Sequence, residues 1–268
     1  MKHAMLYLVM WAAVTVSLEA REVAASAVPF IPAELDLGAL TAPDGGKGET
    51  APGFRFRGAV TFLQYAKAGE PVKFTVNNHP LGKNRAPFTV AFFSPRGERI
   101  GSQRMEPGAN TVSFTAKETG VYRFSGTTSA AVSFDSAMPG QGMAAKPLGM
   151  FATRRRSLYF EAPEGAKEIM IYVRGDPGEP ISVRIYDGRG QLMGELENVT
   201  LGRAFRHHRV FPNREIWRIE IPFMREDSSI ELGGDLNPVL ALTPELLLRG
   251  RPRRTDEGKG KDRDRSGD

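Results

Sequence analysis

The chain has 268 residues, of which 41% are hydrophobic and 25% are charged, so it can form one or two globular domains with a sizeable core. It has no cysteine, which excludes disulfides, thiolate metal sites and a cysteine nucleophile. Glycine and proline make up about 18% of the chain, against roughly 12% in average usage. This excess favours turns and short strands over long helices.

Residues 1–27 have the pattern of an export signal. A basic start is followed by an apolar run from Ala4 to Val16, which is too short to cross a bilayer. Small residues allow cleavage after Ala20 or after Ala27, and both sites stay open. We therefore expect a secreted or periplasmic protein of the bacterial envelope, with no transmembrane segment after cleavage; the alternative is an N-terminal membrane anchor.

The net charge of +5 is concentrated at the C-terminal end. Residues 249–268 carry eight Lys or Arg against five Asp or Glu and contain no apolar side chain that could be buried. This composition predicts a disordered basic tail. Residues 21–248 have a net charge of only +2, so we expect no nucleic-acid partner.

Residues 28–53 are rich in proline and glycine and are predicted to be a linker. Residues 54–137 have the period of two that strands require, as the alternation over residues 72–76 shows. Turn sequences separate these runs, for example Ser-Pro-Arg-Gly at 94–97. The pattern predicts antiparallel strands joined by short turns.

The same pattern restarts after a stretch rich in Gly, Met and Pro at residues 138–150, which is predicted to be an inter-domain linker. Residues 151–248 form the second region, with apolar alternation over 181–185 and again over 217–221. A second antiparallel domain is therefore expected here.

The two regions are copies of one another. Residues 88–101 align with 181–194 without a gap. Identical residues occur at Val90/Val183, Arg96/Arg189, Gly97/Gly190 and Gly101/Gly194. The alignment predicts corresponding core positions for Phe92 and Ile185 and for Tyr122 and Trp217. An all-β fold of two tandem antiparallel β-sandwich domains is the simplest architecture.

The repeated residues also carry a family resemblance. A strand leading into Ser-Pro-Arg-Gly at 94–97 or Asp-Gly-Arg-Gly at 187–190, with a closing strand such as Gly-Val-Tyr-Arg-Phe at 120–124, resembles the bacterial pre-peptidase C-terminal (PPC-like) β-sandwich. The resemblance covers residues 54–235, although the second copy has Glu215 in place of the closing glycine. It implies a non-catalytic module of a secreted bacterial protein.

A short helix is predicted at the end of the second domain. Thr243 suits the N-cap position, Pro244 the first helical position and Glu245 the first turn. Leu246 and Leu247 would pack this helix against the domain.

The chain contains no recognisable catalytic or cofactor motif. His207 and His208 are adjacent, so on a strand they point to opposite faces and do not form a shared metal site. The carboxylates available for glycosidase-like pairing or for calcium lie mostly beside Pro or Gly in turns; they are Glu161, Glu164, Glu168, Asp176, Glu179 and Asp187. We therefore expect no catalytic residue, no metal and no cofactor.

Basic residues of the second copy form the candidate binding site: Arg154, Arg155, Arg156, Arg206, His208 and Arg209. Arginine binds carboxylate or sulfate through two parallel hydrogen bonds, and Phe205 and Phe211 nearby could stack on sugar rings. An acidic polysaccharide is therefore the candidate ligand. The competing interpretation is an ordinary solvated strand face that protects a sheet edge from aggregation.

The sequence thus predicts a secreted, non-catalytic binding or structural module of the bacterial envelope, whose partner is an acidic polysaccharide or an envelope protein. The alternative is a polysaccharide-active enzyme or an accessory subunit of one. No sequence feature predicts the oligomeric state.

Overall fold

The structure is a computed structural model that describes residues 29–43, 54–83, 85–151, 156–211 and 213–250. All regular secondary structure in this part of the chain is β, which confirms the predicted fold class. Its strands are β1 (Leu40–Thr41), β2 (Phe56–Ala66), β3 (Pro71–His79), β4 (Phe88–Phe93), β5 (Arg99–Met105), β6 (Gly108–Thr115), β7 (Gly120–Asp135), β8 (Gln141–Ala144), β9 (Leu148–Phe151), β10 (Arg156–Ala162), β11 (Glu168–Gly175), β12 (Ile181–Tyr186), β13 (Leu192–Val199), β14 (Arg203–His208), β15 (Glu215–Met224), β16 (Asp227–Gly234), β17 (Val239–Leu240) and β18 (Arg249–Gly250). The predicted export signal and almost all of the predicted tail lie outside the described residues.

The second copy, which we call the second repeat, is a two-layer sandwich. One layer has the strand order β10-β15-β12-β13, and the other contains β14-β11-β16. Alternate residues of both layers are buried, as the predicted period of two requires. Trp217 lies between the layers, with ring centroids 6.1 Å from Phe160 and 5.5 Å from His207.

The first copy, the first repeat, is built the same way but shares one strand between its layers. The sixteen-residue strand β7 pairs with β4 and β2 through its first half and with β3 through its second half. Aromatic rings fill the space between the layers. Phe62 lies 4.9 Å from Phe134, and Phe74 lies 4.7 Å from Phe124, between ring centroids. These close ring contacts form the core of the first repeat.

The strand register supports the alignment of the two repeats. Phe92 of β4 is opposite Phe124 of β7, and Ile185 of β12 is opposite Ile219 of β15, as the alignment requires. The following pairs match as well: Arg123 lies over the ring of Phe93 at 4.2 Å, and Arg218 over the ring of Tyr186 at 4.1 Å. Tyr122 and Trp217 are both buried.

The turns after β4 and β12 are also equivalent. Ser94 Oγ accepts hydrogen bonds from the backbone of Arg96 and Glu98. Asp187 Oδ1 accepts the corresponding bonds from Arg189 and Gln191. A short polar side chain at the start of each turn therefore closes it by bonding its own backbone.

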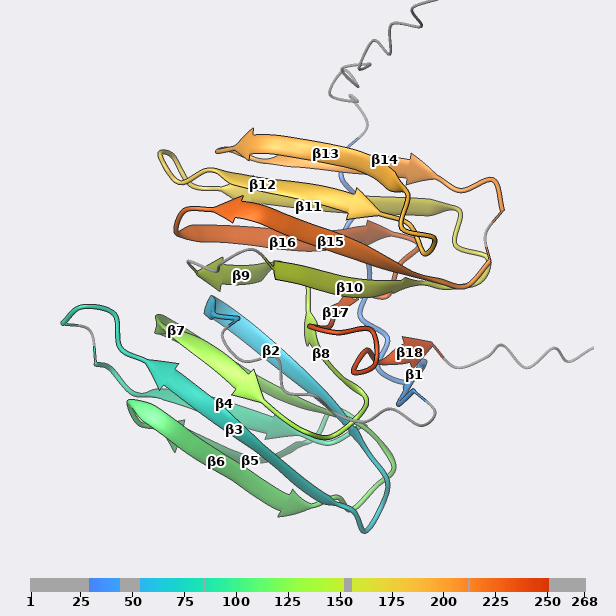
Figure 1. The fold of residues 1–268 in the computed structure, drawn as a ribbon. Helices are drawn as coiled ribbons and strands as arrows, with labels where there is room; N and C mark the ends of the chain where they lie inside the picture. Colours follow the sequence, from blue (N-terminus) through green and yellow to red (C-terminus); the bar gives the residue numbers. More distant parts are fainter. Residues whose placement is uncertain (1–28, 44–53, 84, 152–155, 212, 251–268) are drawn as a thin grey trace, which may run out of the picture.

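The repeats are joined through hydrogen-bonded strands, so the predicted split into two separate domains is not what the structure shows. Figure 1 shows β8 and β17 between the two groups of strands. The predicted linker at residues 138–150 contains β8 and most of β9. β9 pairs with β16 of the second repeat and with β2 of the first, which makes one twelve-stranded sheet.

The other layer is connected as well. β8 pairs with β2 and with β17, and Ala241, which follows β17, exchanges two backbone hydrogen bonds of 2.9 Å with Tyr159 of β10. One hydrophobic cluster contains buried residues of both repeats. We conclude that the described repeats form one continuous structure.

The predicted helix after Thr243 is wrong; the structure has a turn there. Leu246, Leu247 and Leu248 are consecutive and all buried, a pattern that the single apolar face of a surface helix does not provide. Its backbone is used for pairing instead, because the Leu246 carbonyl accepts a 2.7 Å hydrogen bond from the Gln141 N–H.

Part of the predicted linker 28–53 is attached to the second repeat. Phe30 lies against Tyr172, with ring centroids 5.3 Å apart, and Ala33 donates a backbone hydrogen bond to Leu232. β1 then pairs with β18, so that Leu40 and Thr41 lie beside the C-terminal end of the described chain (Figure 1).

The fused architecture predicts that a core change in one repeat is felt by the other. We expect Phe124→Leu, in the fully buried centre of the first repeat, to lower the free energy of unfolding by roughly 1 kcal/mol. Because the repeats share the twelve-stranded sheet and one hydrophobic cluster, the unfolding midpoint reported by Trp217 fluorescence in a Trp11→Phe background should shift with the circular dichroism midpoint. An unchanged Trp217 midpoint would mean that the repeats unfold separately.

Candidate functional site

The structure does not bring the described members of the predicted basic site together. Arg156 begins β10, whereas Arg209 binds the loop beyond Ala162 at the other end of that strand. The seven residues of β10 span about 20 Å at the usual rise of a strand. Arg154 and Arg155 lie outside the described residues.

Arg209 holds loops together inside the protein. Its side chain is 4% exposed, and its guanidinium donates hydrogen bonds to the carbonyl oxygens of Pro163 (3.2 Å), Ala166 (3.1 Å) and Asn213. Its Nη2 lies 3.6 Å from the carboxylate of Glu215. Burial lowers the pKa of Arg209, while Glu215 raises it. The guanidinium is thus occupied by internal contacts.

Arg206 and His208 lie on β14, at the edge of the twelve-stranded sheet. Arg206 forms an ion pair with Glu168 of the neighbouring strand β11. His208 is exposed, whereas His207 faces the core beside Trp217, where burial is the largest cause of its lowered pKa. The two imidazoles therefore lie on opposite faces. This arrangement fits the interpretation of a solvated edge.

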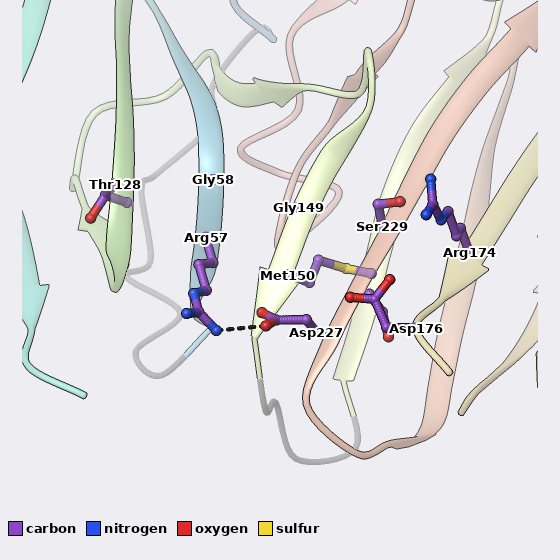
Figure 2. A pocket seen from close by; sticks show the side chains of 10 residues that line it. Arg57, Gly58, Thr128, Gly149, Met150, Arg174, Asp176, Asp227 and Ser229 are labelled. Atoms are coloured by element: carbon purple, nitrogen blue, oxygen red, sulfur yellow. Dashed lines mark hydrogen bonds and ion pairs between the residues drawn. The ribbon is translucent and has the colours of Figure 1, made fainter. Parts of the chain in front are cut away.

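A different set of polar residues meets at the junction between the repeats. They line a pocket of about 370 Å³, which we call the seam pocket (Figure 2). Its walls come from β2, β7, β9, β11 and β16, so both repeats contribute. The side chains that determine its chemistry are Arg57, Arg174, Asp176, Asp227 and Ser229.

Two glycines leave part of the pocket wall without side chains. At Gly149 of β9 an added Cβ would lie 2.2 Å from the carbonyl oxygen of Arg57, so only glycine permits this approach of β9 to β2. Gly58 has a φ of +80°, which favours glycine, and nothing lies within 4 Å of the place its Cβ would take. The pocket is open at this point.

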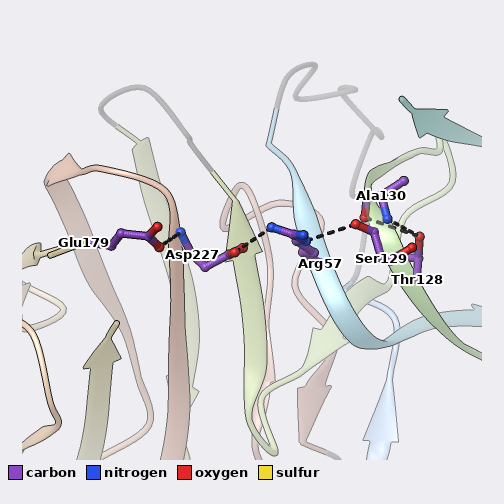
Figure 3. Close-up of polar contacts among 6 residues, drawn as sticks. All are labelled: Arg57, Thr128, Ser129, Ala130, Glu179 and Asp227. Atoms are coloured by element: carbon purple, nitrogen blue, oxygen red, sulfur yellow. Dashed lines mark hydrogen bonds and ion pairs between the residues drawn. The ribbon is translucent and has the colours of Figure 1, made fainter. Parts of the chain in front are cut away.

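A continuous row of polar contacts crosses the junction (Figure 3). The Nε of Arg57 donates a 3.1 Å hydrogen bond to the carbonyl of Ser129, and its Nη1 lies 2.5 Å from Oδ2 of Asp227. The backbone N–H of Asp227 in turn donates to Glu179 at 3.0 Å. The row runs from β7 through β2 to β16 and the turn after β11, so it fixes Arg57 and Asp227 in the wall of the pocket.

The Asp227 carboxyl stands in a negative environment. Burial raises its pKa above the ordinary value of 3.8, and Glu179, Asp176 and Glu226 raise it further, whereas Arg57 lowers it. The ion pair with Arg57 therefore offsets only part of the free-energy cost of ionising the Asp227 carboxyl. The carboxylates around Asp227 make this region of the pocket unfavourable for another anion.

Several polar side chains of the seam pocket are uncommitted, and among the described residues the buried Oγ of Ser228 is one of them. Among the described residues, the side chains of Arg174, Asp176 and Ser229 have no hydrogen bond or ion pair with the protein. Figure 2 shows them in the same part of the pocket. The pocket thus offers a guanidinium donor, a carboxylate acceptor and a hydroxyl that does both.

The electrostatics predict how the Asp227 carboxyl titrates. We expect its NMR titration midpoint to lie above 3.8 and to rise further in Arg57→Gln, because the guanidinium stabilises the ionised form. Arg189→Gln, in the β12–β13 turn, should leave the midpoint unchanged. A midpoint that falls in Arg57→Gln would contradict this electrostatic picture.

Most of this pocket has no local signature in the sequence. Asp176 is one of several carboxylates in turns, and Arg57 and Asp227 are 170 residues apart in the chain. A local signal is present at Gly149, within the predicted linker at residues 138–150. Its glycine marks a close approach of two strands rather than flexibility.

Comparison with protein-family models and with curated proteins finds no match. Among solved structures, the M60 catalytic domain with the CBM51-1 and CBM51-2 domains of Clostridium perfringens ZmpB is similar to 78% of this chain, at 8% sequence identity and a TM-score of 0.26. The match spans 38% of that chain's length. A TM-score this low carries no argument about fold or function.

Two further findings concern the described residues alone. They contain no group of three or more His, Asp or Glu placed to hold a metal ion. They also contain no helix with the length and apolar character needed to cross a membrane.

Proposed function

We propose that this chain is a non-catalytic binding module of the bacterial envelope that contacts polysaccharide through the seam pocket. The observation that carries the proposal is the open pocket at the junction, where Arg174, Asp176 and Ser229 face a ligand-sized space without partners in the described protein. Export to the envelope and the PPC-like nature of each repeat are parts of the same proposal, and rest on the sequence patterns.

The chemistry of the pocket supports a sugar ligand. A sugar hydroxyl both donates and accepts hydrogen bonds, so it can use a guanidinium, a carboxylate and a serine hydroxyl together. The groups stand on or next to strands of a continuous sheet, and Arg57 and Asp227 are held by further contacts. The sheet backbone, Arg57 and Asp227 therefore lose little entropy on binding, whereas the side chains of Arg174, Asp176 and Ser229 become ordered by the ligand.

A polysaccharide-active enzyme is the second candidate, and one observation favours it. The pocket contains two carboxylates, Asp176 and Asp227, and the pKa of Asp227 is raised, as it is in acid–base pairs of glycosidases. Against this role, the Asp227 carboxylate is held by Arg57, which favours its ionised form.

The experiment is affinity gel electrophoresis of the purified chain in a panel of soluble polysaccharides, combined with assay of released reducing ends. Retardation without release supports the binding module. Release that is lost in Asp227→Asn would establish the enzyme instead. Unchanged mobility in every polysaccharide, together with no release of reducing ends, would reject both functions.

A further inference from the structure

The seam pocket contains equal numbers of positive and negative side chains, and some of them are already paired with one another. Arg57 and Arg174 stand against Asp176 and Asp227, and Arg57 is already paired with Asp227. Glu179 and Glu226 lie close enough to affect Asp227. Among the described lining residues, the guanidinium of Arg174 is then left to attract an anion, and it shares the pocket with the carboxylates of Asp176 and Asp227.

A charged ligand therefore gains little in this pocket. The carboxylate of an acidic sugar would be attracted by Arg174 but repelled by Asp176 and Asp227, whereas an ammonium group would be attracted by these carboxylates but repelled by both arginines. A neutral ligand meets no such opposition. It can still use the uncommitted donor and acceptors, because hydrogen bonds to charged groups are stronger than those between neutral groups.

Two features of the seam pocket indicate a ligand that carries hydroxyl groups on neighbouring carbon atoms. A carboxylate such as that of Asp176 has two oxygens and can accept from two adjacent hydroxyls at once. The hydroxyl of Ser229 and the guanidinium of Arg174 stand in the same part of the pocket (Figure 2). The backbone at Gly58, in another part of the same pocket wall, has open space where a side chain would stand.

From this arrangement we infer that the seam pocket selects a neutral sugar unit with vicinal hydroxyls over an acidic one. This inference rests on the proposed polysaccharide-binding function and replaces the acidic ligand expected from the basic residues, whose described members do not converge.

The test uses two pairs of probes. Polygalacturonate carrying methyl esters is neutral, and removal of the esters restores its charge without altering the ring hydroxyls. Dextran has vicinal hydroxyls on intact rings, and periodate oxidation followed by reduction removes these hydroxyl pairs and opens the rings. We expect retardation by esterified polygalacturonate and by dextran, and at least tenfold weaker binding of each modified partner.

The protein variants locate the binding. Arg174→Gln and Asp176→Ala should each weaken binding of dextran by about tenfold, because each loses a hydrogen bond from a charged group. Arg189→Gln, an exposed arginine outside the pocket, should bind as the unmodified chain does. Thermal unfolding of each variant shows whether the fold is kept, and Arg174→Lys serves where it is not.

The outcomes separate the two proposals. Equal or tighter binding of the de-esterified polymer, or full binding by both pocket variants, would overturn the preference for a neutral vicinal diol while leaving a polysaccharide-binding protein. Absence of binding to every polysaccharide tested would overturn the proposed function together with this inference.

Discussion

Trp217→Ala should lower the free energy of unfolding by about 3–5 kcal/mol, as deletion of a buried aromatic side chain does. Trp217 is 2% exposed and packs against Phe160 and His207 between the layers of the second repeat. Its indole N–H also donates a 3.0 Å hydrogen bond to Glu215. Alanine would leave a cavity lined by rings that cannot collapse fully.

Urea unfolding followed by circular dichroism measures this change, because the variant loses its main fluorophore. Leu201→Ala is the matched control. Leu201 is 74% exposed, so its truncation should change stability by less than about 0.5 kcal/mol. A loss below about 1 kcal/mol in Trp217→Ala would contradict the buried position of the indole.

Arg209→Met should be the most damaging of the changes to the predicted basic site, with a loss of about 3 kcal/mol. Methionine keeps much of the side-chain volume but removes the donors that satisfy the carbonyls of Pro163, Ala166 and Asn213. It also leaves Glu215 without this cation.

Arg206→Met is the control for Arg209→Met. The Arg206–Glu168 pair is partly exposed, so its loss should cost less than about 1 kcal/mol. Neither substitution should weaken binding of polysaccharide by the protein that remains folded. Weaker polysaccharide binding by folded Arg206→Met would show that the binding site lies on β14 rather than in the seam pocket. Equal free energies of unfolding of the two variants would contradict the internal role of Arg209.

The local parts of the fold could be predicted from the sequence because they depend on neighbouring residues. Alternation over residues 181–185 marks β12, and the aligned turns at Ser94 and Asp187 close by the same side-chain hydrogen bonds. The match of Phe92 with Ile185 also places both residues in equivalent pairings.

The junction could not be predicted in this way. Residues 138–150 read as a linker because Gly and Pro have low strand propensity, yet their backbone supplies β8 and β9 to the twelve-stranded sheet. The Thr-Pro-Glu sequence at 243–245 suits a helix start and a turn equally well. Long-range pairing with Gln141 decides between them.

The candidate site, like the junction, depends on contacts between residues that are far apart in the sequence. The basic residues are close in the sequence or share one strand region, but the length of β10 separates Arg156 from the loop that Arg209 binds. Arg57 and Asp227 meet only because β9 lies between β2 and β16. Their pairing is a product of topology and has no local pattern.

The pairing of β17 with β8 affects the chain while it is being synthesised. β8 follows the first repeat directly, but its outer neighbour, β17, is synthesised only after the whole second repeat. Until Val239 and Leu240 arrive, β8 is an exposed edge whose backbone groups can pair with another chain. A nascent or truncated chain that ends before Val239 should therefore need protection from aggregation, which the complete chain provides for itself.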